Sequence, residues 1–181
     1  MKRIAINGFG RIGRVLFRIL MQNESYQIIA INDLGSPQIL SHLLKYDSIH
    51  GRYHGEIRYT NESIIVDGKE IYILNNPDID SLPWRQMKID VVFECTGLFR
   101  TFKENFSHIS AGAKKVILSS PPIDDINMIV LGVNDYLIKK TDQILSNASC
   151  TTNCAAPMIK ILDDAFGVNS AYVTTVHSYT S

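Results

Sequence analysis

The first 33 residues contain the pattern that most limits what this chain can fold into. A short apolar run, Arg3–Asn7, leads directly into Gly8-Phe9-Gly10-Arg11-Ile12-Gly13, which fits G-x-G-x-x-G. Apolar residues then recur at helical spacing over residues 14–21, and a second apolar run over residues 27–33 ends in Asp33. Strand, glycine turn, helix, strand and acid in this order are typical of a βαβ unit that binds a dinucleotide.

Each residue of this pattern has a physical role. Gly8 permits the tight turn, Gly10 lets a pyrophosphate approach the backbone, and Gly13 lets the helix pack on the strand. The phosphates would lie over the helix N-terminus, and Asp33 would accept hydrogen bonds from an adenosine ribose. Because no basic residue follows in Leu34-Gly35-Ser36, NAD is favoured over NADP. A tight βα turn without a ligand is the alternative interpretation.

The following residues extend the same architecture. The pattern predicts helices over 38–45 and 103–111, and strands over 90–94, 115–119, 128–133 and 143–146. Short β-favouring pieces between 53 and 73, with Asp67-Gly68 as a hairpin turn, predict an antiparallel insertion. The expected fold class is therefore α/β, a Rossmann-type, doubly wound and mostly parallel sheet. Thr96 and Gly97 follow a predicted strand, so we expect them to contact the cofactor.

The second chemical feature is Cys150, within Ser149–Cys154. A helix is expected from 154 to 166, which puts the thiol near a helix N-terminus, where backbone dipoles favour the thiolate. His177 ends a β-branched run that is predicted to be a strand. The 27 positions between them allow a helix to run out and a strand to return. A Cys–His pair formed in this way would be a nucleophile able to form a covalent intermediate.

A lone cysteine is more often a small buried hydrophobic residue, which is the interpretation given to Cys95 and Cys154. Cys150 differs because its neighbours are small hydroxyl residues and asparagine. With a dinucleotide nearby, its thiolate would add to an aldehyde to give a thiohemiacetal, and His177 would take the hydroxyl proton. The resulting thioester would be cleaved by a second nucleophile, and the Cys150 N–H would help to stabilise the oxyanion.

Composition excludes several other classes of function. The formal net charge is zero, which argues against nucleic acid or an anionic membrane as the main partner. No apolar run is long enough to span a bilayer, and the N-terminus does not resemble a signal peptide. Three cysteines without a framework spacing suggest a reducing, cytoplasmic compartment. No zinc-ligand pattern accompanies Cys150 and Cys154, so no metal is expected.

Several motifs together resemble the glyceraldehyde-3-phosphate dehydrogenase family, almost from end to end of the chain. They are Asn7–Arg14, Ile31–Asp33, Tyr46–Gly51, Glu94–Phe99, Ala111–Val116, Ser146–Cys154 and Thr175–Thr180. The resemblance implies NAD-dependent oxidation of glyceraldehyde 3-phosphate with inorganic phosphate to 1,3-bisphosphoglycerate, in glycolysis. It also implies a cytoplasmic homotetramer.

The resemblance assigns roles residue by residue. Cys150 would be the nucleophile and His177 its base. The implied cofactor-binding residues are Gly8, Gly10, Arg11, Ile12, Gly13, Asn32, Asp33, Thr96, Gly97 and Ser119. The implied phosphate and substrate contacts are Ser149, Thr151 and Thr180.

Two departures from the family pattern affect these expectations. Leu74-Asn75-Asn76-Pro77 stands where the family commonly has Glu-Arg-Asp-Pro near the adenine. The chain also ends at Ser181. We expect an NAD-binding domain over 1–149 and the start of a second, α+β catalytic domain over 150–181, so that this chain alone is an inactive fragment. Erythrose-4-phosphate dehydrogenase activity and a non-catalytic NAD-binding module are the alternatives.

Overall fold

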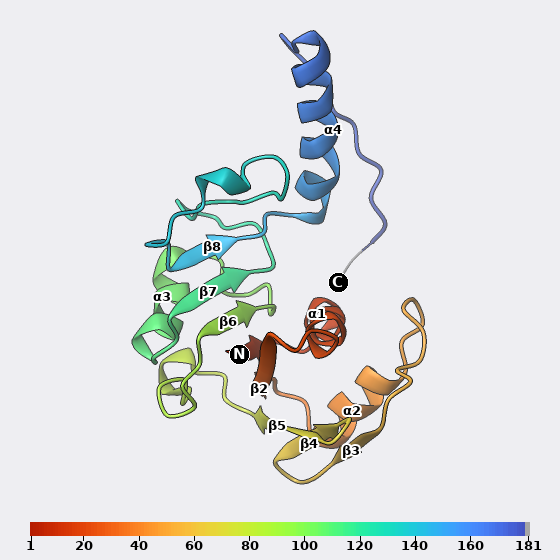
Figure 1. Ribbon diagram of the computed structural model, residues 1–181, viewed down its shortest axis with the longest axis vertical. Coiled ribbons are helices and arrows are strands. Elements are labelled where there is room, and N and C mark those ends of the chain that lie inside the picture. The colour runs from red at the N-terminus through yellow and green to blue at the C-terminus, as the bar shows by residue number, and fades with distance from the viewer. Residues whose placement is uncertain (180–181) are drawn as a thin grey trace.

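A computed structural model describes residues 1–179, which form one sheet of eight strands in the order β3-β4-β5-β2-β1-β6-β7-β8. Strands β5, β2, β1, β6, β7 and β8 are mutually parallel, and β3 and β4 are added antiparallel at one end (Figure 1). The predicted fold class, a mostly parallel, doubly wound α/β sheet with a small antiparallel insertion, is confirmed. The strands are β1 (Lys2–Asn7), β2 (Tyr26–Asn32), β3 (Ile57–Tyr59), β4 (Ser63–Val66), β5 (Lys69–Leu74), β6 (Val91–Glu94), β7 (Lys115–Leu118) and β8 (Ile144–Ser146).

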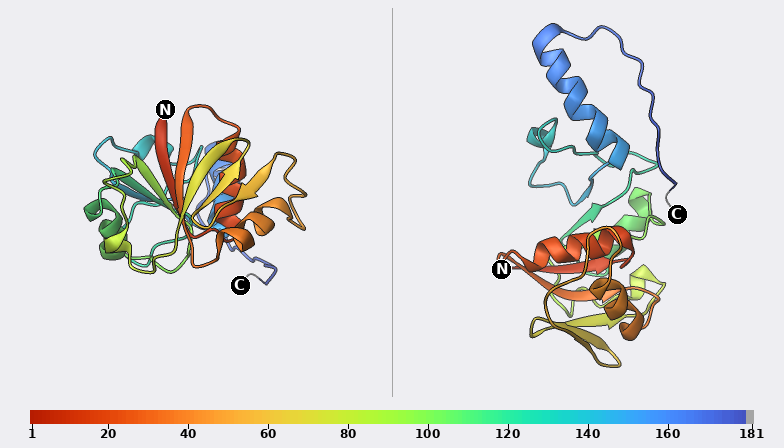
Figure 2. Two further views of the ribbon diagram at one scale, coloured as in Figure 1. Left: turned by 90° about the horizontal axis from the view of Figure 1, so that it is seen from below. Right: turned by 90° about the vertical axis from the view of Figure 1, so that its right-hand side faces the viewer.

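Within residues 1–179, four helices accompany this sheet, and three of them cover its two faces (Figure 2). The four helices are α1 (Arg11–Met21), α2 (Pro37–Lys45), α3 (Phe102–Ser110) and α4 (Cys150–Phe166), with short 3₁₀ turns η1 (Ile79–Ser81) and η2 (Asp135–Leu137). Figure 2 shows α1 and α2 on one side of the twisted sheet and α3 on the other. The chain starts in the middle of the sheet at β1, goes to β2 on one side, and later places β6 on the other side. Strand order therefore reverses at β1, and ligands of such sheets bind at this reversal.

Side chains that alternate along β1 contribute to two separate cores, one on each face of the sheet. Ile4 and Ile6 of β1 pack with Phe17 of α1 and Leu44 of α2, whereas Ala5 packs with Trp84 on the opposite face. This is the two-residue period of a strand that is buried on both faces. The two-residue period is interrupted in β2, where the register with β1 shifts. Ile4 pairs with Ile28 and Ala5 pairs with Ala30, so Ile29 of β2 is skipped.

The antiparallel insertion forms where the sequence predicts it. Asp67 and Gly68 connect β4 to β5, and both have positive φ, 50° and 76°. Such a pair is the geometry of a type I′ hairpin turn, which matches the twist of the flanking strands. The insertion extends the sheet beyond β5.

Helix α3 begins with a complete capping box. The Thr101 hydroxyl accepts from the Glu104 N–H, and the Glu104 carboxylate accepts from the Thr101 N–H at 2.9 Å. We expect Thr101→Ala to lower the free energy of unfolding by about 1 kcal/mol, because the orphan N–H loses its acceptor. Urea unfolding measures this, with Thr101→Ser as the matched control that keeps the hydroxyl. A loss as large in the serine variant would contradict the capping role.

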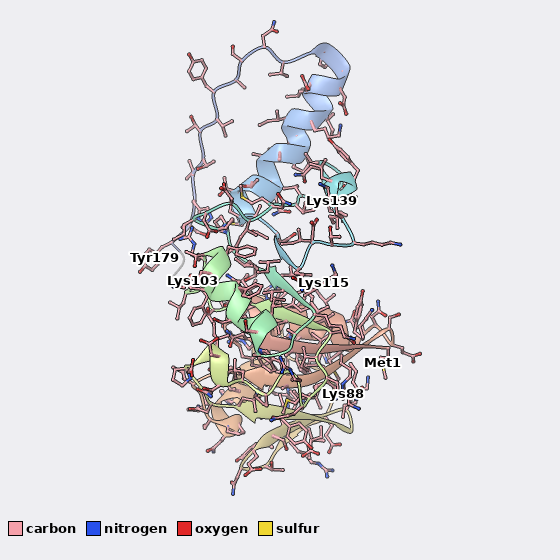
Figure 3. The ribbon with its side chains drawn as sticks, turned by 90° about the vertical axis from the view of Figure 1, so that its left-hand side faces the viewer. Met1, Lys88, Lys103, Lys115, Lys139 and Tyr179 are labelled. Carbon is pink, nitrogen blue, oxygen red and sulfur yellow. The ribbon has the colours of Figure 1, made fainter. Side chains whose placement is uncertain are left out.

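Two predicted strands are wrong. The β-branched run ending at His177 is extended but forms no strand, and the segment after α4 is exposed throughout residues 167–179. A strand needs a neighbour to pair with, and the described part of the chain gives this segment none. Figure 3 shows the side chain of Tyr179, at the end of this segment, pointing away from the sheet. The predicted strand over 128–133 is reduced to one bridge, between Met128 and Ser146.

Helix α4 stands clear of the sheet, and residues 168–179 run back beside it toward the sheet (Figures 1 and 2). Its apolar side chains are exposed, among them Ile161 at 68% and Phe166 at 83%. Among residues 1–179, no helix is long and apolar enough to cross a membrane.

Candidate functional site

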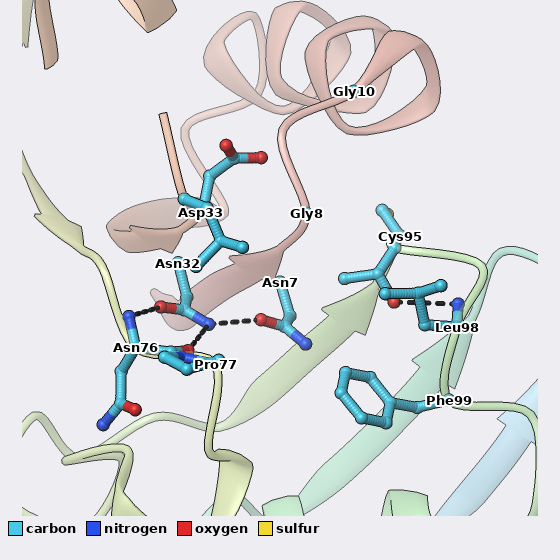
Figure 4. Close-up of a pocket in the computed structure, with 12 residues that line it drawn as sticks. Asn7, Gly8, Gly10, Asn32, Asp33, Asn76, Pro77, Cys95, Leu98 and Phe99 are labelled. Atoms are coloured by element: carbon cyan, nitrogen blue, oxygen red, sulfur yellow. Dashed lines mark hydrogen bonds between the residues drawn. The ribbon is translucent and has the colours of Figure 1, made fainter. Parts of the chain in front are cut away.

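A pocket of about 350 Å³ opens at the carboxyl edge of the parallel strands, at the point where strand order reverses. Its lining comes from the ends of β1, β2, β5 and β6, as Figure 4 shows. The lining residues are Asn7, Gly8, Gly10, Asn32, Asp33, Leu34, Asn76, Pro77, Cys95, Thr96, Leu98 and Phe99. This is the place at which a doubly wound sheet binds a dinucleotide.

The three glycines of the β1–α1 turn have three different environments. A Cβ at Gly8 would lie 2.7 Å from the Thr96 backbone nitrogen, and φ of Gly8 is +89°. A Cβ at Gly13 would lie 2.2 Å from the Gly8 carbonyl oxygen. At Gly10 a Cβ would meet no atom within 4 Å. Gly8 and Gly13 therefore serve the packing of the protein, whereas the open space at Gly10 fits a pyrophosphate against the backbone.

The start of α1 supports the same interpretation. Gly10 is the N-cap and supplies no side-chain cap, and α1 has no acidic residue in its first turn. Arg14 donates to the Phe9 carbonyl at 3.0 Å, which holds the glycine turn. An uncapped helix N-terminus with a fixed turn is suited to an anionic ligand.

Asp33 lies at the end of β2 and holds the turn from the other side. One carboxylate oxygen accepts from the Phe9 N–H at 2.7 Å, and the other accepts from the Gly35 N–H at 2.8 Å. Each oxygen keeps a lone pair for a ribose hydroxyl. Asp33 is therefore both a support of the glycine turn and a candidate ribose acceptor.

The segment that departs from the family pattern is tied to the same site. The Asn75 side chain donates to the Asp33 carbonyl at 3.1 Å. Asn76 exchanges backbone hydrogen bonds with the Asn32 amide, at 3.0 Å and 2.9 Å. Asn75 thus holds the wall of the pocket through its side chain, and Asn76 holds it through its backbone N–H and carbonyl.

Some predicted cofactor residues line the pocket and others do not. Gly8, Gly10, Asn32, Asp33 and Thr96 line it. The rest surround it: Arg11, Ile12 and Gly13 form the first turn of α1, Gly97 has φ +72° in the loop after β6, and Ser119 follows β7.

Sequence reasoning placed Asn76 and Pro77 near the adenine without naming them as site residues, and it missed another part of the lining, namely Asn7, Leu34, Cys95, Leu98 and Phe99. Asn7 ends β1, and Asn76 comes two residues after β5. The rule that parallel strands present their carboxyl ends to ligands could have identified both.

The second part of the site is a direct contact between Cys150 and His177. The Cys150 sulfur lies 3.3 Å from His177 Nε2, and His177 Nδ1 lies 2.6 Å from the Ser178 carbonyl oxygen. A carbonyl only accepts, so Nδ1 carries the proton and the Nε2 lone pair faces the thiol. This is the arrangement of a nucleophile with its base. Both residues line a groove of about 400 Å³ between α4 and residues 173–177.

The pair shifts both titrations in the direction that activates a thiol. The hydrogen bond with His177, followed by those from Thr151, lowers the pKa of Cys150. The hydrogen bond with Cys150, followed by that with the Ser178 carbonyl, raises the pKa of His177. Each effect favours a thiolate beside an imidazolium.

Local structure at the start of α4 orients the thiol. Cys150 is the first helical residue, four residues earlier than the predicted helix start, and Ser149 is the N-cap, whose hydroxyl accepts from the Thr152 N–H at 3.0 Å. Just before it, Ala148 has φ +57°, a conformation that costs a non-glycine residue about 1 kcal/mol. The chain therefore turns sharply between β8 and α4, which presents Cys150 at the sheet edge.

The predicted phosphate and substrate contacts follow from this turn in part. Ser149 caps α4 and Thr151 lies beside Cys150 in its first turn, so both are next to Cys150. Thr180 lies outside the described residues.

The remaining cysteines differ from Cys150. Cys95 is largely buried beside the pocket, and burial raises its pKa to about 12. Cys154 is exposed, so the expectation that it is a buried core residue is wrong. It follows Cys150 by one helical turn on α4, a helix without buried side chains. Within residues 1–179, no three His, Cys, Asp or Glu side chains gather in a way that could hold a metal ion.

Residues 2–102 match the family model described as "Glyceraldehyde 3-phosphate dehydrogenase, NAD binding domain". The chain belongs to the glyceraldehyde 3-phosphate dehydrogenase family. Residues 149–181 match the C-terminal domain of the same family, and that match begins at the N-cap of α4. The pocket at the sheet edge thus lies in the NAD-binding domain of the family.

Curated relatives carry the family name. Glyceraldehyde-3-phosphate dehydrogenase 2 of Bacillus subtilis is 50% identical over 180 residues, which cover 99% of this chain and 53% of that protein. The Thermotoga maritima glyceraldehyde-3-phosphate dehydrogenase is 48% identical over 183 residues, 100% of this chain and 55% of that protein. The Clostridium pasteurianum protein of the same name is 45% identical over 181 residues, which cover 100% of this chain and 54% of that protein. The chain spans about half the length of these relatives.

Proposed function

We propose that this chain carries the cofactor site and the nucleophile for NAD-dependent oxidation of glyceraldehyde 3-phosphate with phosphate to 1,3-bisphosphoglycerate. The Cys150–His177 contact carries this proposal, because it supplies a nucleophile and a base beside an NAD-binding domain. We assign residues 1–149 to that domain and 150–181 to the catalytic domain. The three relatives named above are each called a glyceraldehyde-3-phosphate dehydrogenase, which supports the proposal.

The two parts of the site face the same edge of the sheet. Strands β6, β7 and β8 are adjacent and parallel, so the loop after β6 and the turn into α4 leave the same edge. Two strand spacings separate them, about 10 Å. An extended dinucleotide lying along this edge would bring its reactive ring toward Cys150.

The residues that fit NAD are those of the pocket. The open space at Gly10 and the α1 N-terminus would accept the pyrophosphate, and Asp33 would accept from the ribose. Thr96, Gly97 and Ser119, at or near the ends of β6 and β7, would lie along the dinucleotide. When bound, NAD supplies the acceptor for the hydride that the oxidation releases.

The chain's own residues then divide the chemistry. The Cys150 thiolate adds to the aldehyde carbon while the His177 imidazolium gives its Nε2 proton to the aldehyde oxygen, which forms a thiohemiacetal and leaves His177 neutral. His177 Nε2 takes the hydroxyl proton as the carbon is oxidised, and the Cys150 N–H at the start of α4 stabilises the oxyanion. The product is a thioester on Cys150, which phosphate cleaves. Ser149, Thr151 and Thr180 would hold the phosphate groups.

Two further expectations concern the state of the protein. Because Cys150 and His177 are exposed, we expect residues 1–181 alone to turn over far more slowly than relatives about twice as long. Electrostatic stabilisation of a transition state is strongest in a site that excludes water. We also propose a cytoplasmic homotetramer, in which the exposed apolar side chains of α4 are covered by further protein surface.

The covalent intermediate gives a direct test. The purified chain is mixed with NAD and glyceraldehyde 3-phosphate without inorganic phosphate, and the Cys150 peptide is weighed. The proposal predicts an acyl group on Cys150, the mass of the aldehyde less two hydrogens, and its loss when phosphate is added. Loss of the acyl group to water at the same rate without phosphate would favour the erythrose-4-phosphate dehydrogenase type. NAD binding without any acylation would favour a non-catalytic module.

A further inference from the structure

A continuous row of hydrogen bonds runs beneath the cofactor pocket, across the ends of four parallel strands. It links Asn76 after β5, Asn32 of β2, Asn7 of β1 and Glu94 of β6. Figure 4 shows the first three of these residues side by side at the base of the pocket. Asn7, Asn32 and Glu94 are buried. Buried polar groups are costly unless each is paired, so such a row has a reason to persist.

The direction of every bond in the row is fixed by the backbone at one end. The Asn32 side-chain oxygen accepts from the Asn76 N–H at 3.0 Å. The Asn32 NH₂ therefore donates to the Asn76 carbonyl at 2.9 Å and to the Asn7 side-chain oxygen at 2.7 Å. This leaves the Asn7 NH₂ to donate to a Glu94 carboxylate oxygen at 2.5 Å. All donors thus point toward Glu94.

Glu94 is the common acceptor at the other end of the row. One oxygen accepts from the Thr96 N–H at 2.7 Å and from the Thr96 hydroxyl. The second accepts from Asn7 and lies 3.2 Å from His108 Nε2. Glu94 is 1% exposed. A group met only by donors is matched by the ionised carboxylate, which is acceptor-only.

The partner beyond Glu94 fixes the form of His108. Trp84, the only tryptophan, approaches His108 Nδ1 with its indole nitrogen at 2.9 Å, and both side chains are fully buried. An indole N–H only donates, so Nδ1 accepts and the proton of the neutral imidazole sits on Nε2. His108 therefore donates to Glu94 as a neutral group.

We infer that Glu94 is a positioning residue of the cofactor pocket, which it acts on without lining it. Its carboxylate sets the side chains of the pocket floor through Asn7, and it sets the wall through Thr96. The Thr96 hydroxyl accepts in turn from the Leu98 N–H at 3.1 Å, so the loop after β6 takes its shape from Glu94. The same loop packs against Gly8, where a Cβ would already clash. A displaced Thr96 would therefore disturb the glycine turn.

Glu94→Gln tests this inference, because it preserves size and removes one acceptor. The NH₂ group of the introduced glutamine must face at least one N–H donor, so two donors oppose each other. His108 cannot turn into an acceptor at Nε2 while Trp84 donates to its Nδ1. Because NAD binding itself rests on the proposed function, calorimetry first confirms binding by the wild type. We expect Glu94→Gln to weaken NAD binding about tenfold or more. The exposed Glu24→Gln, the same chemical change elsewhere, stays within twofold of the wild type.

A second substitution distinguishes a positioning role of Glu94 from a general loss of structure in the variant. Trp84→Phe removes the indole donor, so His108 becomes free to carry its proton on Nδ1 and to accept from the introduced amide, which removes one of the two donors that the amide NH₂ meets there and leaves the Asn7 NH₂ as the other. We therefore expect the double variant to bind NAD at least threefold more tightly than Glu94→Gln alone. If the loss of NAD affinity in the double variant equals the product of the losses in Glu94→Gln and Trp84→Phe, the inference is overturned.

Two readouts need no cofactor. In the ¹⁵N-labelled wild type we expect His108 Nδ1 to be unprotonated and Nε2 protonated, and the Thr96 amide to exchange at least tenfold faster in Glu94→Gln than in Glu24→Gln. A protonated Nδ1, or unchanged Thr96 exchange, would overturn the role of Glu94. The nitrogen measurement uses the wild type alone, so it decides even if Glu94→Gln does not fold. Absence of NAD binding by the wild type would count against the proposed function and not against this row of hydrogen bonds.

Discussion

Replacing Gly10 with alanine will weaken NAD binding at least tenfold and leave the free energy of unfolding within about 0.5 kcal/mol of the wild type. The added methyl group meets no protein atom within 4 Å, and φ of Gly10, −68°, suits alanine. The packing of the folded protein is therefore unchanged by the methyl group. A pyrophosphate bound against the glycine turn is displaced, because it needs the space that the methyl group takes. Calorimetric titration with NAD and urea unfolding measure the two quantities.

Gly13→Ala is the matched opposite. Its methyl group would lie 2.2 Å from the Gly8 carbonyl oxygen, which is backbone and cannot turn aside. We expect a loss of about 3 kcal/mol or more in the free energy of unfolding, as for severe overpacking. A folded Gly10→Ala variant that binds NAD as tightly as the wild type would place the pyrophosphate elsewhere.

Cys150 will be alkylated by iodoacetamide at pH 7 at least a hundredfold faster than Cys95. The thiolate is the reactive form, and about 10⁻⁵ of Cys95 is thiolate at that pH, because its pKa is about 12. The pKa of Cys150 is lowered, chiefly by the hydrogen bond with His177, and the thiol is exposed. Peptide mapping after short exposures gives the rate at each cysteine.

His177→Gln shows whether the histidine is responsible. The Cys150 thiolate is present above its lowered pKa and is lost as the pH falls through that pKa. Without His177 the inflection of the alkylation profile moves to higher pH, and the rate at pH 7 falls several-fold. Cys154, exposed and four residues along the same helix, is the internal reference. Equal rates at Cys150 and Cys154 in the wild type would refute activation by His177.

Local sequence patterns were sufficient for most of the fold. The run Arg3–Asn7, the glycine turn and the run ending at Asp33 each depend on neighbours within the same βαβ unit, so local reasoning found them. The β-branched run before His177 shows where such reasoning stops, because a strand exists only if another strand pairs with it. Helix α4 begins at Cys150, because the Ser149 cap and the turn at Ala148 start it there.

The candidate site divides in the same way. Gly8, Gly10, Asp33 and Thr96 lie in recognisable patterns and line the pocket. The row of hydrogen bonds beneath it joins residues up to 87 positions apart, as between Asn7 and Glu94. The spacing of these residues in the sequence does not predict that they are in contact. Only the order of strands in the sheet brings them together.

Calorimetric titration of NAD into the 181-residue chain tests the central claim most directly. A pocket built at the carboxyl edge of β1, β2, β5 and β6 predicts saturable binding at one site. It also predicts binding of NADP at least tenfold weaker, since Asp33 would repel a 2′-phosphate. A chain that unfolds in one cooperative thermal transition yet takes up no NAD would contradict the account.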